Sequence, residues 1–225
     1  MSTVTSLTLS HFRSHKHLQL DLDTRPVAIF GPNGSGKTNI MEAVSLFSPG
    51  RGMRRASAEA MMRRPESLGW KITGQIQTFV KSIEIESISE YGASRQVKID
   101  GKPATQLELG KHARVLWLVP TMDRLWIEGA DGRRRFLDRI TLSFFPKHAE
   151  NCLFYDKAMR ERNRLLKEKV NDAHWYIALE RQMAKSGAAI SNARTKAIER
   201  ISQAQTSACT RFPAAKLELQ QSEGT

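Results

Sequence analysis

Strand-length segments in which apolar and polar residues alternate recur through the first half of the chain. Val4, Leu7 and Leu9 indicate an opening strand, and residues 18–23 alternate strictly between apolar and polar side chains. This period of two is typical of a strand with one buried face. Three further segments predict consecutive antiparallel strands, and they span residues 70–78, 81–89 and 96–99. Asp100-Gly101 follows the last of them and favours a tight hairpin turn.

Two other segments are apolar almost throughout. Residues 26–30 and 115–119 are continuous runs of strand length, which predict strands buried on both faces. Residues 39–47 instead place apolar side chains at helical spacing, with Ile40 and Val44 on one face. Together these segments predict an α/β fold that contains a mixed sheet and an antiparallel β flap.

From residue 131 onward the apolar spacing becomes that of helices. Asp131 is a candidate N-cap for a first helix, which Pro146 ends. Two longer helices are predicted over residues 148–169 and 172–206. In the longer one, apolar residues recur at spacings near multiples of 3.5. This pattern is typical of two antiparallel helices that protrude as an arm, and a simple helical bundle would give the same pattern.

The change in periodicity predicts two lobes. Residues 1–130 would form a lobe that holds the sheet, and residues 131–225 would form a mostly helical second lobe. Residues 212–219 predict the start of a further strand in that second lobe.

The segment between the apolar run at 26–30 and the predicted helix fits the phosphate-binding pattern G-x-x-x-x-G-K-[ST] at every fixed position. It consists of Gly31, Pro32, Asn33, Gly34, Ser35, Gly36, Lys37 and Thr38. The glycines allow backbone N–H groups to wrap an anion at a helix N-terminus, because a Cβ would obstruct the turn. In this pattern Lys37 reaches the β- and γ-phosphates, and the Thr38 hydroxyl binds Mg²⁺. The sequence therefore predicts a site for ATP with Mg²⁺.

The charge of the chain favours a polyanionic partner. Thirty-five basic residues against 23 acidic ones give a formal net charge of +12. The excess is concentrated in residues 51–64, 133–135 and 157–169. The candidate contacts with DNA phosphates are Arg51, Arg54, Arg55, Arg63, Arg64, Arg133 and Arg134. A basic helical face is also often only a solvated surface, and the triad at 133–135 would equally suit a salt bridge between the lobes.

Membrane, secreted and metal-binding classes are disfavoured. The longest apolar run, residues 115–119, is far too short to span a bilayer, and the N-terminus lacks the pattern of a secretory signal. Cys152 and Cys209 are too few for a disulfide framework or a zinc site, and the histidines add no metal-ligand spacing. The cytoplasm is the simplest compartment, and no membrane partner is expected.

Several segments resemble the chromosome and repair ATPases of the ATP-binding-cassette type, and the bacterial RecF family in particular. They occur in the family's order at residues 9–15, 31–42, 48–54, 120–125 and 132–138. The stretch RRRFLD, which begins at Arg133, is much more specific than the phosphate loop. The family places an arginine at the end of the first strand near the bound phosphates, which implies this role for Arg13. Asp123 lies where the sequence departs from the family's usual pattern, so it receives no role.

The resemblance implies an ABC/SMC-like P-loop NTPase fold. It implies a full-length protein that binds ATP and Mg²⁺, forms an ATP-dependent homodimer and binds single-stranded or gapped DNA. Its partners would be RecO- and RecR-like repair proteins. The processes implied are recombinational gap repair, replication restart and SOS induction.

Two elements that this class needs for hydrolysis are missing from the sequence. They are an apolar strand that ends in Asp-Glu and an L-S-G-G-Q-like signature. Glu128 follows only three apolar residues and does not qualify. RecF-like chains carry both elements further toward the C-terminus, so we expect an incomplete second lobe, no catalytic residues, weak nucleotide binding and no hydrolysis. The alternatives are an ABC-type ATPase of a non-DNA system, a P-loop phosphotransferase, and a nucleic-acid scaffold with a vestigial loop.

Overall fold

The computed structural model describes residues 2–127 and 129–220. The chain divides into two compact units, one that ends at Val119 and one that begins at Pro120. The sequence pattern instead predicts a boundary after residue 130.

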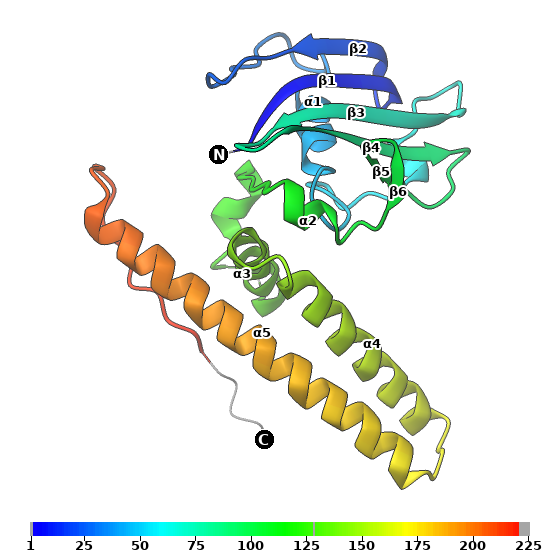
Figure 1. The fold of residues 1–225 in the computed structure, drawn as a ribbon, viewed down its shortest axis with the longest axis vertical. Coiled ribbons are helices and arrows are strands. Elements are labelled where there is room, and N and C mark those ends of the chain that lie inside the picture. The colour runs from blue at the N-terminus through cyan, green and yellow to red at the C-terminus, as the bar shows by residue number, and fades with distance from the viewer. Residues whose placement is uncertain (1, 128, 221–225) are drawn as a thin grey trace. The chain divides into compact units, whose positions relative to one another are not determined.

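The first unit is built on one antiparallel sheet of six strands in the order β2-β1-β3-β4-β5-β6 (Figure 1). The strands are β1 (Thr3–Phe12), β2 (His15–Asp21), β3 (Gly69–Gln77), β4 (Ser82–Glu90), β5 (Gln96–Ile99) and β6 (Lys102–Ala104). The predicted opening strand, the alternating strand after it and the three consecutive antiparallel strands are confirmed. The predicted turn is confirmed as well, because Asp100 and Gly101 both have positive φ and join β5 to β6.

Helix α1 (Lys37–Ser45) packs against one face of this sheet (Figure 1). Leu46 and Phe47, which directly follow the helix, are fully buried with the inward residues of the strands. Gly74 of β3 makes room for Phe47, because a Cβ at Gly74 would lie 2.3 Å from the Phe47 ring. This close packing fixes the position of α1, and therefore of the loop that precedes it. The unit also contains the short helices η1 (Glu59–Met61) and α2 (Leu109–His112).

The two continuous apolar runs do not form the buried strands that the sequence predicts. Residues 26–30 and 115–119 pair with no strand of the described residues. Phe30 is 92% exposed, and Leu118 is 76% exposed. A strand needs a neighbour that satisfies its N–H and C=O groups, and an apolar sequence cannot supply that neighbour. Within the described residues, the sheet is therefore antiparallel and not mixed.

The second unit is helical, as predicted. It contains η2 (Pro120–Arg124), α3 (Ala130–Phe144), α4 (His148–Lys167) and α5 (Ala173–Ser207). Helices α4 and α5 run side by side as an antiparallel pair (Figure 1). Asp172 caps α5 by accepting hydrogen bonds from the N–H groups of His174 and Trp175. No helix in the described ranges is both long and apolar enough to cross a membrane.

Two local predictions for this unit are wrong. Asp131 lies inside the first turn of α3 and does not cap the helix, because the N-cap residue is Gly129. Residues 212–219 form no strand. Instead, the side-chain amide of Gln205 exchanges two hydrogen bonds with the backbone of Ala215. The returning chain is thereby held against the end of α5.

The carboxylate of Asp138 links the three long helices of the second unit. From α3 it accepts two hydrogen bonds from Arg194 of α5, at 2.8 and 2.9 Å. It also bonds to His148 Nε2 of α4 at 2.8 Å. Burial raises the pKa of Asp138, but the hydrogen bonds from His148 and Arg194 outweigh burial and leave that pKa below its ordinary value.

We expect Asp138→Asn to lower the free energy of unfolding by about 2 kcal/mol at pH 7, because charge-assisted hydrogen bonds are lost. Because the pKa of Asp138 is lower in the folded state, the extra stability of the wild type over Asp138→Asn is fully present above the ordinary aspartate pKa of about 3.9. It disappears as the pH falls through the folded value. Urea unfolding followed by helical circular dichroism between pH 3 and 7 measures this difference. An advantage of the wild type that persists undiminished at pH 3 would contradict the assignment.

Candidate phosphate-binding site

The glycine-rich loop has the backbone conformation that its sequence predicts. Gly31, Gly34 and Gly36 all have positive φ, a region that side chains with a Cβ rarely adopt. At Gly36 space is also lacking, because a Cβ would lie 2.5 Å from the ring of His15 and 2.7 Å from Ser14 Oγ. Helix α1 begins at the next residue, so its unpaired N–H groups lie at the loop.

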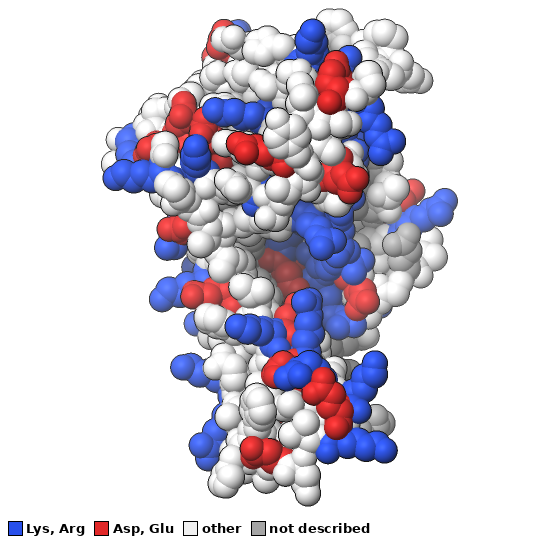
Figure 2. Space-filling view, turned by 90° about the vertical axis from the view of Figure 1, so that its right-hand side faces the viewer, with Lys and Arg blue, Asp and Glu red and all other residues white. Residues whose placement is uncertain are grey.

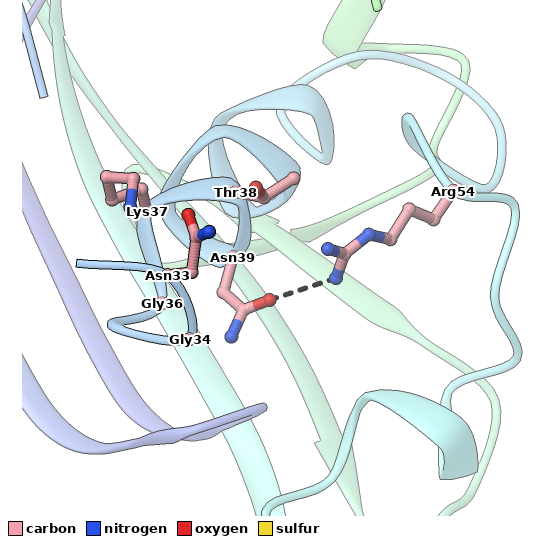
Figure 3. Close-up of a pocket in the computed structure, with 7 residues that line it drawn as sticks. All are labelled: Asn33, Gly34, Gly36, Lys37, Thr38, Asn39 and Arg54. Atoms are coloured by element: carbon pink, nitrogen blue, oxygen red, sulfur yellow. Dashed lines mark hydrogen bonds between the residues drawn. The ribbon is translucent and has the colours of Figure 1, made fainter. Parts of the chain in front are cut away.

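A hollow of about 270 Å³ opens at the junction of the loop and the helix. Its walls are formed by Asn33, Gly34, Gly36, Lys37, Thr38, Asn39 and Arg54 (Figure 3). This volume lies just below the range of ligand pockets, which is roughly 300–1,000 Å³. It suits a phosphate group better than a whole nucleotide. The predicted residues Gly31, Pro32 and Ser35 belong to the loop but do not line the hollow, and their contact with ATP stays a prediction.

Lys37 is half-buried and held against the loop. Its ammonium group donates hydrogen bonds to the carbonyl oxygens of Gly31 at 2.8 Å and Pro32 at 2.7 Å. An ammonium group has three donors, so a further one is available to an anion in the hollow. Thr38 also lines the hollow (Figure 3), and its contact with Mg²⁺ stays a prediction.

Arg13, a predicted ATP contact, is engaged elsewhere. Its guanidinium forms a two-point ion pair with Glu42, with N···O distances of 2.9 and 2.6 Å. Its third nitrogen donates to the carbonyl oxygen of Ala60 at 2.6 Å. Arg13 is not among the residues that line the hollow. The structure therefore places Arg13 as a link between the β1–β2 turn and α1, and its contact with phosphate stays a prediction.

Arg54, a predicted DNA contact, instead lines the hollow (Figure 3). Its Nη1 donates to Asn39 Oδ1 at 2.9 Å and to Glu42 Oε2 at 3.0 Å. With 42% of its side chain exposed, the guanidinium remains open to an anion. Sequence reasoning missed this role. The available signal was that the arginine-rich stretch closely follows α1, whose first turn forms the site.

The other candidate DNA contacts are divided between the two units. Arg51, Arg55 and Arg64 are exposed. Arg63 donates to the Ser14 carbonyl oxygen at 2.6 Å. In the second unit, Arg134 pairs with Asp131 at 2.8 Å and Arg133 is partly buried. Figure 2 shows basic side chains interleaved with acidic ones on the face that it presents. Contact of these arginines with DNA stays a prediction.

A second cluster of titratable side chains was missed by the sequence analysis. The ligand atoms of Asp138, His148 and Cys152 lie within 4.8 Å of one another, because His148 and Cys152 are one turn apart on α4. Two features argue against a metal centre. Arg194 already occupies both carboxylate oxygens of Asp138. In addition, burial raises the pKa of Cys152 to about 11, which keeps the thiol protonated. The cluster is best explained as a brace between helices.

Comparison with known proteins agrees with this geometry. A model of the AAA domain matches residues 6–208. The DNA replication and repair protein RecF of Rhizobium rhizogenes is 42% identical over 222 residues, which are 96% of this chain and 59% of that protein. RecF of Brucella suis is 42% identical over 202 residues, which are 88% of this chain and 53% of that protein. The chain thus spans somewhat more than half the length of these relatives.

Solved structures show the same fold. The recombination mediator protein RecF-ATP of the RecFOR pathway aligns with a TM-score of 0.80 at 22% identity, over 92% of this chain and 56% of that one. A structure of an SMC ATPase, described by its ATP-driven dimerization and DNA-stimulated activation, aligns with a TM-score of 0.50 at 20% identity, over 61% of this chain. The chain therefore belongs to the AAA-domain family of P-loop ATPases and is, over the part that it spans, a homologue of the RecF DNA replication and repair proteins.

Proposed function

We propose that the chain is the nucleotide-binding part of a DNA repair protein that binds single-stranded or gapped DNA under the control of ATP and Mg²⁺. The phosphate hollow carries this proposal. Lys37, Thr38 and Arg54 meet there at a helix N-terminus, and each supplies a group that recognises a triphosphate or its cation. The similarity to RecF proteins and the net charge of +12 support DNA as the partner.

At full length, the protein would act in recombinational gap repair, replication restart and SOS induction. We further propose an ATP-dependent homodimer and RecO- and RecR-like partners. These proposals rest on the resemblance to RecF proteins. Within the site, the loop N–H groups and Lys37 would hold the phosphates, and Arg54 would neutralise further charge from the opposite wall. Mg²⁺ held through Thr38 would supply additional positive charge to the same oxygens.

Binding of ATP to this chain alone should be weak. Residues 26–30 lead directly into the loop, and they are exposed and unpaired among the described residues. An unpaired segment leaves the loop anchored firmly only on its helical side, so ATP must supply the ordering free energy itself. We also propose that the chain does not hydrolyse ATP. The sequence contains no apolar strand that ends in Asp-Glu, and Glu128 lies outside the described residues.

A salt titration tests the DNA part of the proposal. We expect the affinity for a single-stranded oligonucleotide to fall by at least about tenfold between 50 and 200 mM NaCl, because counterions are released from the phosphates. Fluorescence anisotropy with a labelled oligonucleotide and with a gapped duplex measures this fall. The logarithm of the affinity falls with the logarithm of the salt concentration along a straight line. Replacing Arg51 and Arg55 by alanine should reduce the slope of this line by about one for each of the two arginines that binds a phosphate. Exchange of the exposed Glu90 for alanine serves as a control in the same unit.

The salt titration, together with assays of ATP turnover and ATP binding, distinguishes the rival functions. An affinity that is independent of salt would exclude DNA phosphates as the main contact. ATP turnover in the absence of DNA would favour a phosphotransferase. DNA binding together with a complete lack of ATP binding would favour a scaffold whose loop is vestigial.

A further inference from the structure

Arg95, which lies on the connection between β4 and β5, has a partly buried guanidinium. Its Nη1 donates a hydrogen bond to the carbonyl oxygen of Gly50 at 2.9 Å. Its Nε and Nη2 atoms are buried, and neither has a hydrogen-bond partner among the described residues. Burial lowers the pKa of Arg95 to about 10, so that the side chain still carries its charge at neutral pH.

Such an arginine is a poor choice for stability alone. A buried charge without a counterion is unfavourable, and every unpaired donor adds a desolvation cost. Replacement of buried charged groups by apolar residues of similar volume is often neutral or stabilising. The presence of Arg95 therefore calls for an explanation in terms of what its hydrogen bond to Gly50 holds.

That hydrogen bond anchors the segment Gly50–Arg55, called here the arginine loop. The loop has no regular secondary structure. Arg95 holds its first residue, and the N–H of Met53 donates to Ser45 Oγ of α1 at 2.8 Å. Between these anchors Gly52 is closely packed, because a Cβ there would lie 2.8 Å from both Leu46 Cδ2 and Ser45 Oγ.

The next residue after the second anchor is Arg54, which reaches the phosphate hollow. Its backbone position is thus determined by the anchors at Gly50 and Met53. A long side chain on a freely moving loop would lose conformational entropy each time it bound a phosphate. A loop that is already held reduces this loss and raises the affinity for the anion.

We propose that Arg95 is a positioning residue for nucleotide binding, which holds the arginine loop so that Arg54 stays at the phosphate hollow. The proposal rests on the proposed function of that hollow as an ATP site. It assigns Arg95 no contact with the nucleotide. It also explains why a partly buried, destabilising charge lies far along the chain from the glycine-rich loop.

The variant Arg95→Met tests the proposal in the whole chain, by titration with a fluorescent ATP analogue and Mg²⁺ and by thermal unfolding. We expect the affinity to fall by about tenfold, the loss typical of one misplaced charged contact. The unfolding temperature should stay unchanged or rise, because the unpaired charge is removed. Arg95→Lys can still donate to Gly50 and should keep the affinity within about threefold. The matched control is Arg114→Met, which removes an exposed arginine of the same unit.

A double variant separates positioning from a general structural effect. If Arg95 acts through Arg54, then Arg54→Ala with Arg95→Met should bind ATP no more weakly than Arg54→Ala alone. Additive losses, an unchanged affinity in Arg95→Met, or a fall in unfolding temperature that accompanies the loss of affinity would each overturn the proposal. Failure of the proposed function is distinct, because then wild type and Lys37→Ala would bind the analogue equally.

Discussion

Replacing Lys37 by alanine is expected to lower the affinity for ATP by about 100-fold, which corresponds to ~3 kcal/mol. This is the upper range of free energy for a hydrogen bond to a charged group. It applies because the ammonium group of Lys37 would interact with several phosphate oxygens at once. The fold should be unaffected. Lys37 is only half-buried, and its two hydrogen bonds reach only carbonyl oxygens of its own loop. Titration with a fluorescent ATP analogue and Mg²⁺ measures the affinity, and circular dichroism checks the fold.

The control for this experiment is Lys102→Ala, which removes an exposed lysine from β6 of the same unit. It should bind ATP as the wild type does. Equal affinity in wild type and Lys37→Ala would show that the glycine-rich loop does not hold the phosphates, even though its backbone has the required conformation.

The second large effect is expected at Glu42, which is only 1% exposed on α1. Its carboxylate pairs with Arg13 from the β1–β2 turn and with Arg54 from the arginine loop. Glu42→Ala leaves two cations without their shared counterion, and we expect it to lower the free energy of unfolding by about 3–5 kcal/mol. The affinity for ATP should fall as well, because Arg54 loses a partner that directs it toward the hollow. Urea unfolding and the nucleotide titration measure the two effects.

Two further variants identify the cause of the Glu42 effect. Glu59→Ala removes an exposed glutamate of the same unit and should leave stability unchanged. Combining Glu42→Leu with Arg13→Met removes both partners of the ion pair and should cost less than Glu42→Ala, since it leaves fewer charges unpaired. A Glu42→Ala variant as stable as the wild type would refute the assignment of Glu42 as the link between these segments.

The features that local sequence predicts correctly are those that depend on neighbouring residues. The strands at 70–78 and 81–89 follow from alternation, since a period of two has one buried face in any sheet. The conformation of Gly31–Thr38 follows from glycines at fixed spacing before a helix. The long helices of the second unit follow from apolar spacing. In each case the chemistry of a few adjacent residues is sufficient.

The segments predicted wrongly depend on partners that lie elsewhere. Residues 26–30 and 115–119 have the composition of buried strands, but no described strand provides their hydrogen-bond partners. Residues 26–30 therefore remain exposed, and residues 115–119 are only partly buried. Pairing between strands is a property of the tertiary structure. Apolar sequence alone predicts only that such a partner is needed.

The same distinction applies to the charged side chains of the site. The sequence identifies the glycine-rich loop, Lys37 and Thr38, because their spacing along the chain is itself the signal. It does not show that Arg13 is paired with Glu42, that Arg54 reaches the hollow, or that Arg95 holds the arginine loop. A guanidinium at the end of a long side chain can reach many partners, so its choice is decided by which carboxylates and carbonyl oxygens the fold brings within hydrogen-bonding distance.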